Sequence, residues 1–228
     1  TIPTNGVDWL PTVPPVVPEL WNGASPPQDA AFTTIGNWSA YGAINYEGEH
    51  YGQKDEEFLH LINLPSRTSQ KLELAISGAG TEVIEQLKQC GWSVKDAGEE
   101  VSTDVETYRN YILNSRGEFS AAKNAYVKTK SGWFSDRSVC YLAAGLPVIL
   151  QNTEFTDWLP SEEGVLAFTT LEAAASAIEK VNADYSVHRH AAIEIAEKVF
   201  NYKVVLSRLV DIALKPAYSS SITHGGVK

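Results

Sequence analysis

The residues best suited to chemistry lie between Glu118 and Leu150. Four cations, Lys123, Lys128, Lys130 and Arg137, fall between positions 121 and 138 beside one acid, Asp136. Four positive charges against one negative give a local charge of +3, in a chain whose net charge is −10 at pH 7. The cluster is therefore a candidate anion site, and a solvated basic loop is the alternative interpretation.

A predicted helix begins where this basic cluster ends. Ser135 belongs to a residue type that is preferred at the N-cap, and it places Arg137 and Ser138 in the first helical turn. The free N–H groups and the positive dipole end of a helix favour an anion, and an arginine there adds a forked, charged donor. A phosphate or pyrophosphate fits this chemistry.

The rest of the chain must supply elements that position this segment, and its pattern alternates between strand and helix. Runs bounded by Gly, Pro and Ser predict strands, and apolar residues spaced three and four apart predict helices of about ten residues. The predicted strands are 31–35, 71–76, 92–94, 119–122 and 147–150. The predicted helices are 55–62, 81–90, 104–113 and 136–144, followed by 171–181, 185–199 and 203–214. This alternation predicts an α/β, Rossmann-like fold with a parallel sheet flanked by helices, which the C-terminal helices close.

Composition excludes several classes of protein. The 228 residues are 43% hydrophobic, no apolar run is long enough to cross a bilayer, and the negative net charge disfavours nucleic acid as a partner. Cys90 and Cys140 are interpreted as reduced thiols. No Cys/His ligand spacing, nucleophile elbow or Walker loop occurs, which disfavours metal-dependent and serine-nucleophile chemistry. Without a signal-peptide pattern at the start, a cytoplasmic location is expected.

The ends of the chain differ from its middle. Seven of the eleven prolines lie in residues 1–27 together with Trp9 and Trp21, so this stretch is predicted to be a connecting segment that lies against apolar surface. Residues 28–214 form the predicted domain, and residues 215–228 are predicted to be a flexible tail. The sequence contains no methionine. Either it is a piece of a longer chain, or modified methionines have been omitted from it.

One stretch resembles a known family. SDRSVCYLAAGLPVI, from Ser135 to Ile149, is similar to the donor-domain signature of GT-B glycosyltransferases, in which a helix with a phosphate-contacting residue leads through a Gly-x-Pro turn into a strand. Arg137 to Gly145 is similar in particular to the spore-protein-like (CgeB-like) group. Many retaining members of the wider superfamily carry a glutamate at the position of Cys140.

This resemblance implies the C-terminal half of a GT-B enzyme, which binds a nucleoside-diphosphate sugar as substrate and needs an N-terminal Rossmann-like domain for the acceptor. Joined to that half, the protein would be a hexosyl-type transferase without a cofactor or metal, because Arg137 and Lys128 or Lys130 would stabilise the leaving diphosphate. Two alternatives stay open: a non-catalytic Rossmann-like binding domain that has lost turnover, and another phosphate-binding α/β domain.

The rule that open α/β sheets bind ligands at strand carboxyl ends adds further candidates. Those for the donor diphosphate are Arg137, Ser138, Ser135, Lys128, Lys130, Gly36, Asn37 and Lys54. Those for the donor base or sugar are Ser77 and Gly78, which end the second predicted strand, and Glu154, which follows the last one. We expect uridine diphosphate or another nucleoside diphosphate to bind near Arg137.

Overall fold

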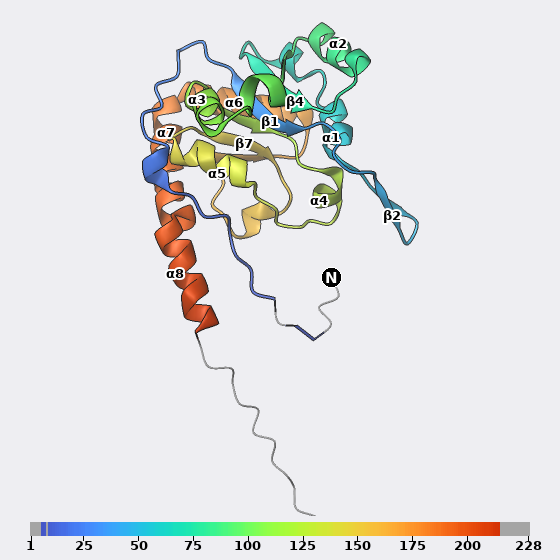
Figure 1. The fold of residues 1–228 in the computed structure, drawn as a ribbon. Helices are drawn as coiled ribbons and strands as arrows, with labels where there is room; N and C mark the ends of the chain where they lie inside the picture. Colours follow the sequence, from blue (N-terminus) through green and yellow to red (C-terminus); the bar gives the residue numbers. More distant parts are fainter. Residues whose placement is uncertain (1–5, 8, 215–228) are drawn as a thin grey trace, which may run out of the picture.

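A parallel β-sheet forms the centre of the molecule in the computed structural model, which describes residues 6, 7 and 9–214 (Figure 1). Its six strands lie in the order β5-β4-β1-β6-β7-β8, and a short antiparallel hairpin, β2-β3, stands apart. The strands are β1 (Phe32–Asn37), β2 (Ile44–Tyr46), β3 (Glu49–Tyr51), β4 (Leu72–Ser77), β5 (Ser93–Asp96), β6 (Gly117–Ser120), β7 (Val148–Gln151) and β8 (Val165–Phe168).

Helices connect the strands and cover both faces of the sheet. The α-helices are α1 (Lys54–His60), α2 (Thr81–Gln89), α3 (Val105–Leu113), α4 (Asn124–Lys128), α5 (Asp136–Ala143), α6 (Leu171–Ala183), α7 (Tyr185–Ile195) and α8 (Tyr202–Ala213). Short 3-10 and π turns add η1 (Pro18–Leu20), η2 (Leu64–Arg67), η3 (Ala97–Val101), η4 (Phe155–Asp157) and η5 (Ala196–Phe200).

Two apolar cores result, one on each face of the sheet. Ile112 of α3, Val139 of α5 and Ala192 of α7 belong to one core. Phe58 of α1 and Ile178 of α6 belong to the other. Because the strands are covered on both faces, β7 is buried along its whole length, as is usual for parallel sheets.

The strand order reverses at β1. From β1 the chain first builds outward through β4 to β5, then returns to the other side of β1 to add β6, β7 and β8. In doubly wound folds, ligands bind at the carboxyl ends of the strands that flank such a reversal, which here are β1 and β6. Lys54 follows β1 and Arg137 follows β6, so both are directed to this edge.

The sequence-based prediction of an α/β, Rossmann-like fold is confirmed, with some local differences. The hairpin β2-β3 and the strand β8 were not predicted. The strand expected at 119–122 ends at Ser120, because the backbone N–H of Ala122 donates to the Gln151 side chain instead of continuing the ladder. The helix expected at 185–199 changes from α to π geometry at Ala196.

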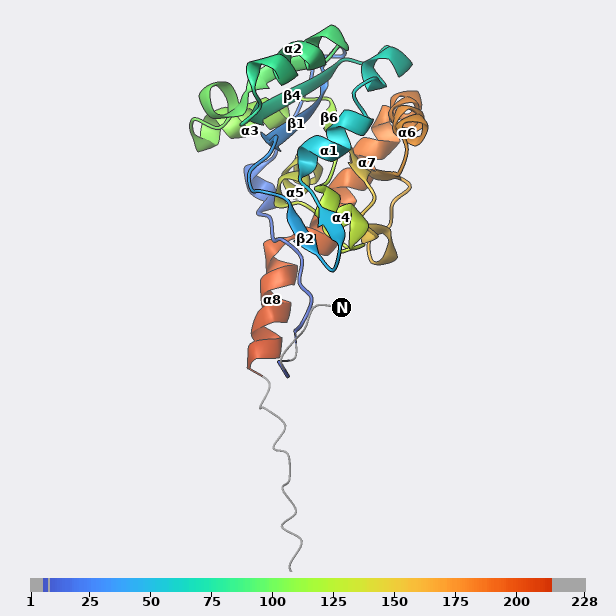
Figure 2. The same cartoon turned by 90° about the vertical axis from the view of Figure 1, so that its right-hand side faces the viewer.

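The N-terminal segment is attached at its second half. Val16 is buried and exchanges backbone hydrogen bonds with Phe200 and Tyr202. Trp9 and Leu10 are exposed, so the predicted contact with apolar surface is wrong for these two residues. Helix α8 projects from the body of the domain (Figure 2). The predicted tail, 215–228, lies outside the described residues. No helix among the residues that the structure describes is long and apolar enough to span a membrane.

Candidate functional site

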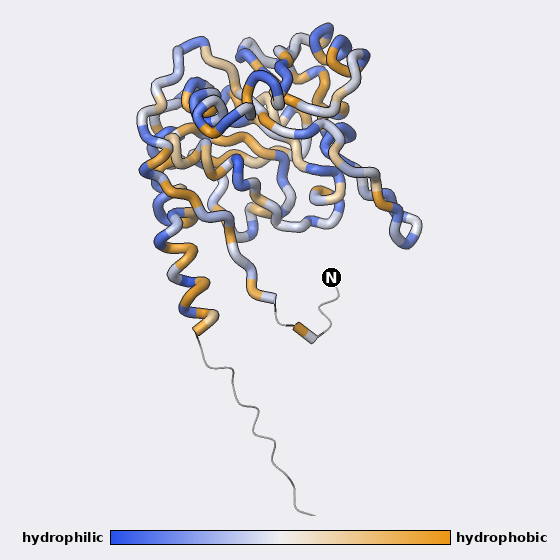
Figure 3. Tube along the Cα trace, viewed as in Figure 1, coloured by the Kyte–Doolittle hydropathy of each residue, from blue (hydrophilic) through white to orange (hydrophobic). Residues whose placement is uncertain are grey.

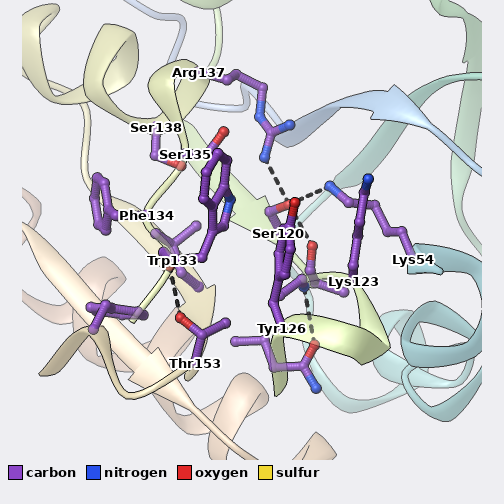
Figure 4. Close-up of a pocket in the computed structure, with 15 residues that line it drawn as sticks. Lys54, Ser120, Lys123, Tyr126, Trp133, Phe134, Ser135, Arg137, Ser138 and Thr153 are labelled. Carbon is purple, nitrogen blue, oxygen red and sulfur yellow. Dashed lines mark hydrogen bonds between the residues drawn. The ribbon is translucent and has the colours of Figure 1, made fainter. Parts of the chain in front are cut away.

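A cavity of about 210 Å³ lies at the carboxyl ends of β6 and β7 (Figure 4). Its walls come from β6, β7, α1, α4 and the loop that leads into α5. The described residues that line it are Lys54, Ser120, Ala121, Ala122, Lys123, Tyr126, Trp133, Phe134, Ser135, Arg137, Ser138, Leu150, Gln151, Thr153 and Phe155. None of these is Asp or Glu, so the charged side chains of the lining, Lys54, Lys123 and Arg137, are all basic.

Arg137 is held against the edge of the sheet. Its Nε donates to Glu118 Oε1 over 2.6 Å, its Nη1 to the Ile35 carbonyl over 2.6 Å, and its Nη2 to Ser120 Oγ over 3.0 Å. These bonds occupy three of the five N–H groups of the guanidinium, and Nη2 also lies 2.6 Å from Glu118 Oε1, which leaves one N–H group of Nη1 for a ligand. The arginine therefore stands at the predicted place, with its orientation fixed before any ligand binds.

Glu118 makes the Arg137 contact a buried ion pair. The Glu118 side chain is fully buried and that of Arg137 is 14% exposed. Burial disfavours the charge on Arg137, but the carboxylate of Glu118 and its hydrogen bonds outweigh burial and raise the pKa of Arg137 above its ordinary value. Glu118 Oε2 has no hydrogen-bond partner among the described residues. The pair adds no net charge, because one carboxylate neutralises one guanidinium.

Lys123 and Lys54 both line the cavity, and neither forms an ion pair with a carboxylate of a described residue. The Nζ of Lys54 lies 3.3 Å from Ser120 Oγ, the hydroxyl that Arg137 also contacts. Burial and, second, the neighbouring Arg137 lower the pKa of Lys54 from 10.5 to about 7. A bound anion would favour the charged form of Lys54.

A buried polar network fixes the start of α1 and with it Lys54. Glu57, 6% exposed, accepts from Gln151 Nε2 over 2.5 Å and from Asn124 Nδ2 over 2.8 Å. Asn124 Oδ1 in turn accepts from the Gly52 backbone N–H. The first turn of α1 is thus tied to β7 and α4, which places the backbone of Lys54 beside the cavity.

The first turn of α5 also faces the cavity. Ser135 is the N-cap residue, as predicted, but its hydroxyl makes no capping bond and donates to Asp136 Oδ1 instead. Ser138 is fully buried, and its Oγ has no hydrogen-bond partner among the described residues although it lines the cavity. A buried hydroxyl without a partner is costly, so a ligand oxygen at the helix N-terminus would relieve that cost.

Gly36, which lies within β1 near its carboxyl end, separates the two cations. A Cβ at Gly36 would lie 3.6 Å from Lys54 Nζ and 3.7 Å from Arg137 Nη1, so the absent side chain keeps the space between them open. Asn37 is exposed at the end of β1 and is the register partner of Ser77 in β4. Ser77 and Gly78 end β4 on the other side of β1 and do not line the cavity.

Three predicted residues are engaged outside the cavity. Lys128 pairs with Glu49 of the hairpin over 2.9 Å, and Lys130 pairs with Glu154 over 3.1 Å. The structure therefore does not bring these lysines, or Glu154, together with Arg137, and the basic sequence cluster is divided in space. Cys140 does not line the cavity either, and burial raises the pKa of its thiol to about 12.

Sequence reasoning missed the aromatic side of the site. Trp133 and Tyr126 line the cavity with their ring centroids 5.1 Å apart, and Figure 4 shows Trp133 and Phe134 on one side and Lys54 and Lys123 on the other. In the sequence, Tyr126 and Trp133 lie between the cations of the basic cluster. Aromatic residues at these positions could have indicated an aromatic wall beside the cations. Among the described residues, no group of three or more His, Cys, Asp or Glu side chains is placed to hold a metal ion.

Solved structures share this fold. The glycosyltransferase AviGT4, involved in avilamycin A biosynthesis, matches with a TM-score of 0.57 and 15% identity over 91% of this chain. Anabaena HepE in complex with UDP and glucose matches with a TM-score of 0.57 and 12% identity over 90% of this chain. Sucrose-phosphate synthase from Thermosynechococcus elongatus matches with a TM-score of 0.55 and 15% identity over 88% of this chain. Neither a family model nor a curated protein sequence matches the chain.

These likenesses define the class of fold. This chain spans 57%, 56% and 50% of the lengths of AviGT4, HepE and the synthase. The chain has the α/β, Rossmann-like fold that makes up half of a GT-B glycosyltransferase, as the resemblance implied.

Proposed function

We propose that this chain is the nucleotide-sugar-binding half of a glycosyltransferase, which moves a sugar from a nucleoside-diphosphate donor to an acceptor. The observation that carries the proposal is the convergence of Lys54 and Arg137 on Ser120 Oγ, at the edge where the strand order reverses. HepE, which is similar in fold, has been solved in complex with UDP and glucose, and this supports a diphosphate donor here. The similarity of Arg137–Gly145 to the CgeB-like group belongs to the same proposal.

The site's residues would act on the leaving group. Lys54 and the free N–H group of Arg137 would hold the diphosphate, and the first turn of α5 with Ser138 would receive its remaining oxygens. Negative charge grows on the diphosphate as the bond to the sugar breaks, and fixed donors at that position stabilise the transition state. In this arrangement Arg137 would orient the diphosphate, and Lys54 would supply positive charge that no carboxylate neutralises.

The acceptor would bind on a second domain that completes the cleft. The chain spans about half the length of the matched glycosyltransferases. It also exposes apolar surface on α8, at Leu206, Leu209 and Val210, and at Trp9 and Leu10. Figure 3 shows hydrophobic residues along the projecting helix α8. An N-terminal Rossmann-like domain of the same protein would cover this surface.

Titration calorimetry with UDP tests the proposal. We expect wild type to bind and Lys54→Gln to bind about ten- to a hundredfold more weakly, the loss of one charged hydrogen bond of about 1.5–3 kcal/mol. Lys128→Gln is the matched control, because Lys128 pairs with Glu49 outside the cavity, and it should bind like wild type. No binding of UDP by wild type, or equal affinities of wild type and Lys54→Gln, would refute the proposal.

A further inference from the structure

The hairpin β2-β3 and the residues before it carry large side chains that the rest of the fold leaves exposed. Ile44 is 66% exposed and Tyr46 is 62% exposed, and Tyr41, which precedes β2, is 72% exposed. A single exposed apolar residue is ordinary, but several on one small element mark a surface that binds another molecule. An isolated two-stranded hairpin is also only marginally stable in water, so contact with another molecule would stabilise it.

The strand register places two of these side chains on one face of the hairpin. Ile44 is directly opposite Tyr51. Tyr46 is directly opposite Glu49, and residues that oppose each other in antiparallel strands point to the same side. The Nζ of Lys128, at the end of α4, lies 2.9 Å from Glu49 Oε2 and 5.3 Å from the centroid of the Tyr51 ring. The face with Ile44 and Tyr46 is therefore the one that α4 contacts.

Helix α4 also connects this face to the cavity. Tyr126 of α4 and Lys123, its N-cap residue, line the cavity. The Nζ of Lys123 lies 5.6 Å from the centroid of the Tyr126 ring and 5.1 Å from that of Tyr41. Tyr41 thus stands at the rim of the cavity. From there the hairpin projects beside α4, as Figure 1 and Figure 2 show.

Charge and position indicate the molecule that lies on this face. Lys128 neutralises Glu49, so the side chains of the face have no net charge, in contrast to the basic lining of the cavity. A tyrosine presents an apolar ring and a polar hydroxyl, which suits a saccharide with C–H groups on its ring faces and hydroxyls at its rim. In the proposed reaction the acceptor must reach the cavity, and an acceptor that extends outward along the hairpin passes Tyr41 first.

We infer that Tyr41 and the Ile44–Tyr46 face of the hairpin bind a neutral oligosaccharide acceptor, whose reacting end lies at the cavity. This inference rests on the proposed function and deepens it, because it names a class of acceptor and places part of the acceptor site on this chain. A second domain would supply the rest of that site.

Saturation-transfer NMR tests the inference with maltotetraose, cellotetraose and tetra-N-acetylchitotetraose, each titrated into the chain with saturating UDP. Wild type should bind at least one of them. Tyr41→Ala combined with Tyr46→Ala should weaken that binding about three- to tenfold, the worth of an aromatic contact. The affinity for UDP should stay within about twofold, because neither tyrosine lines the cavity. The corresponding double phenylalanine variant should retain most of the saccharide affinity. Leu206→Ala, which changes an exposed apolar side chain on α8, is the matched control and should bind like wild type.

The outcomes separate this inference from the proposed function. If wild type binds UDP but none of the three saccharides, or if the double alanine variant binds them as wild type does, the acceptor surface is overturned and the proposed function stands. Light scattering tests a second copy as the occupant: a wild-type dimer that the double alanine variant dissociates would also overturn the inference. Failure of wild type to bind UDP would refute the proposed function itself.

Discussion

Two groups of cations in this molecule have opposite surroundings. Lys128 and Lys130, at and just beyond the end of α4, are solvent-exposed, and each pairs with a surface carboxylate. Lys54 and Arg137 lie at the carboxyl ends of the strands, where Arg137 pairs with the buried Glu118 and Lys54 contacts the Ser120 hydroxyl. Exposed ion pairs are worth little and exchange readily with water, whereas a cation without a carboxylate at a half-buried edge binds an anion strongly. Burial and strand order, more than charge density along the sequence, distinguish a binding site from a solvated loop.

The largest effect is expected on stability when Arg137 is removed. Arg137→Ala leaves the fully buried Glu118 without its partner, which should cost about 3–5 kcal/mol of unfolding free energy. Chemical denaturation measures this difference. Lys128→Ala is the comparison variant and should lose at most about 1 kcal/mol, as exposed pairs do. Equal stability of the two variants would remove the distinction between the two groups of cations.

A double variant sharpens the same point. Glu118→Gln combined with Arg137→Met removes both charges at once, so it should recover most of the stability that Arg137→Ala loses. The same denaturation measurement applies. If the double variant is less stable than Arg137→Ala, the cost does not come from the unpaired carboxylate.

The next effect concerns the pH dependence of UDP binding. Lys54, with a pKa of about 7 in the free protein, must take up a proton above that pH to meet the diphosphate, whose charge raises the pKa of the lysine in the complex. The affinity should therefore fall as the pH rises from about 7 to 9, by at most about tenfold per unit. Calorimetry across this range measures it, and Lys54→Gln should show no such fall. A pH-independent affinity in wild type would contradict the assigned role of Lys54.

The smallest effect is expected at the exposed pair of Lys130 and Glu154. Neither residue lines the cavity, so Glu154→Gln should change UDP affinity by less than about twofold and stability by less than about 1 kcal/mol. Calorimetry with UDP measures the affinity, and chemical denaturation measures the stability. A tenfold loss of UDP-glucose affinity would restore Glu154 as a sugar contact, as the resemblance implied.

The sequence predicted the sheet and the first turn of α5 well because both depend on local patterns. Apolar runs bounded by Gly and Pro identified β1, β4 and β7, and Ser135 with Gly145 marked the ends of α5. The pairing of Arg137 with Glu118 could not be predicted, since it joins residues 19 positions apart through the packing of α5 on β6. The separation of Lys128 from Arg137 depends on the hairpin β2-β3, whose short exposed strands carry no buried alternation that would reveal them.

The most direct measurement is a crystal structure of the chain with UDP. We expect the diphosphate to lie at the carboxyl end of β1, with oxygens within hydrogen-bond distance of Lys54 Nζ, Arg137 Nη1 and Ser138 Oγ. Lys128 and Lys130 should keep their carboxylate partners. A diphosphate bound at Lys128 and Lys130, with no density beside Lys54 and Arg137, would refute the assignment of the site.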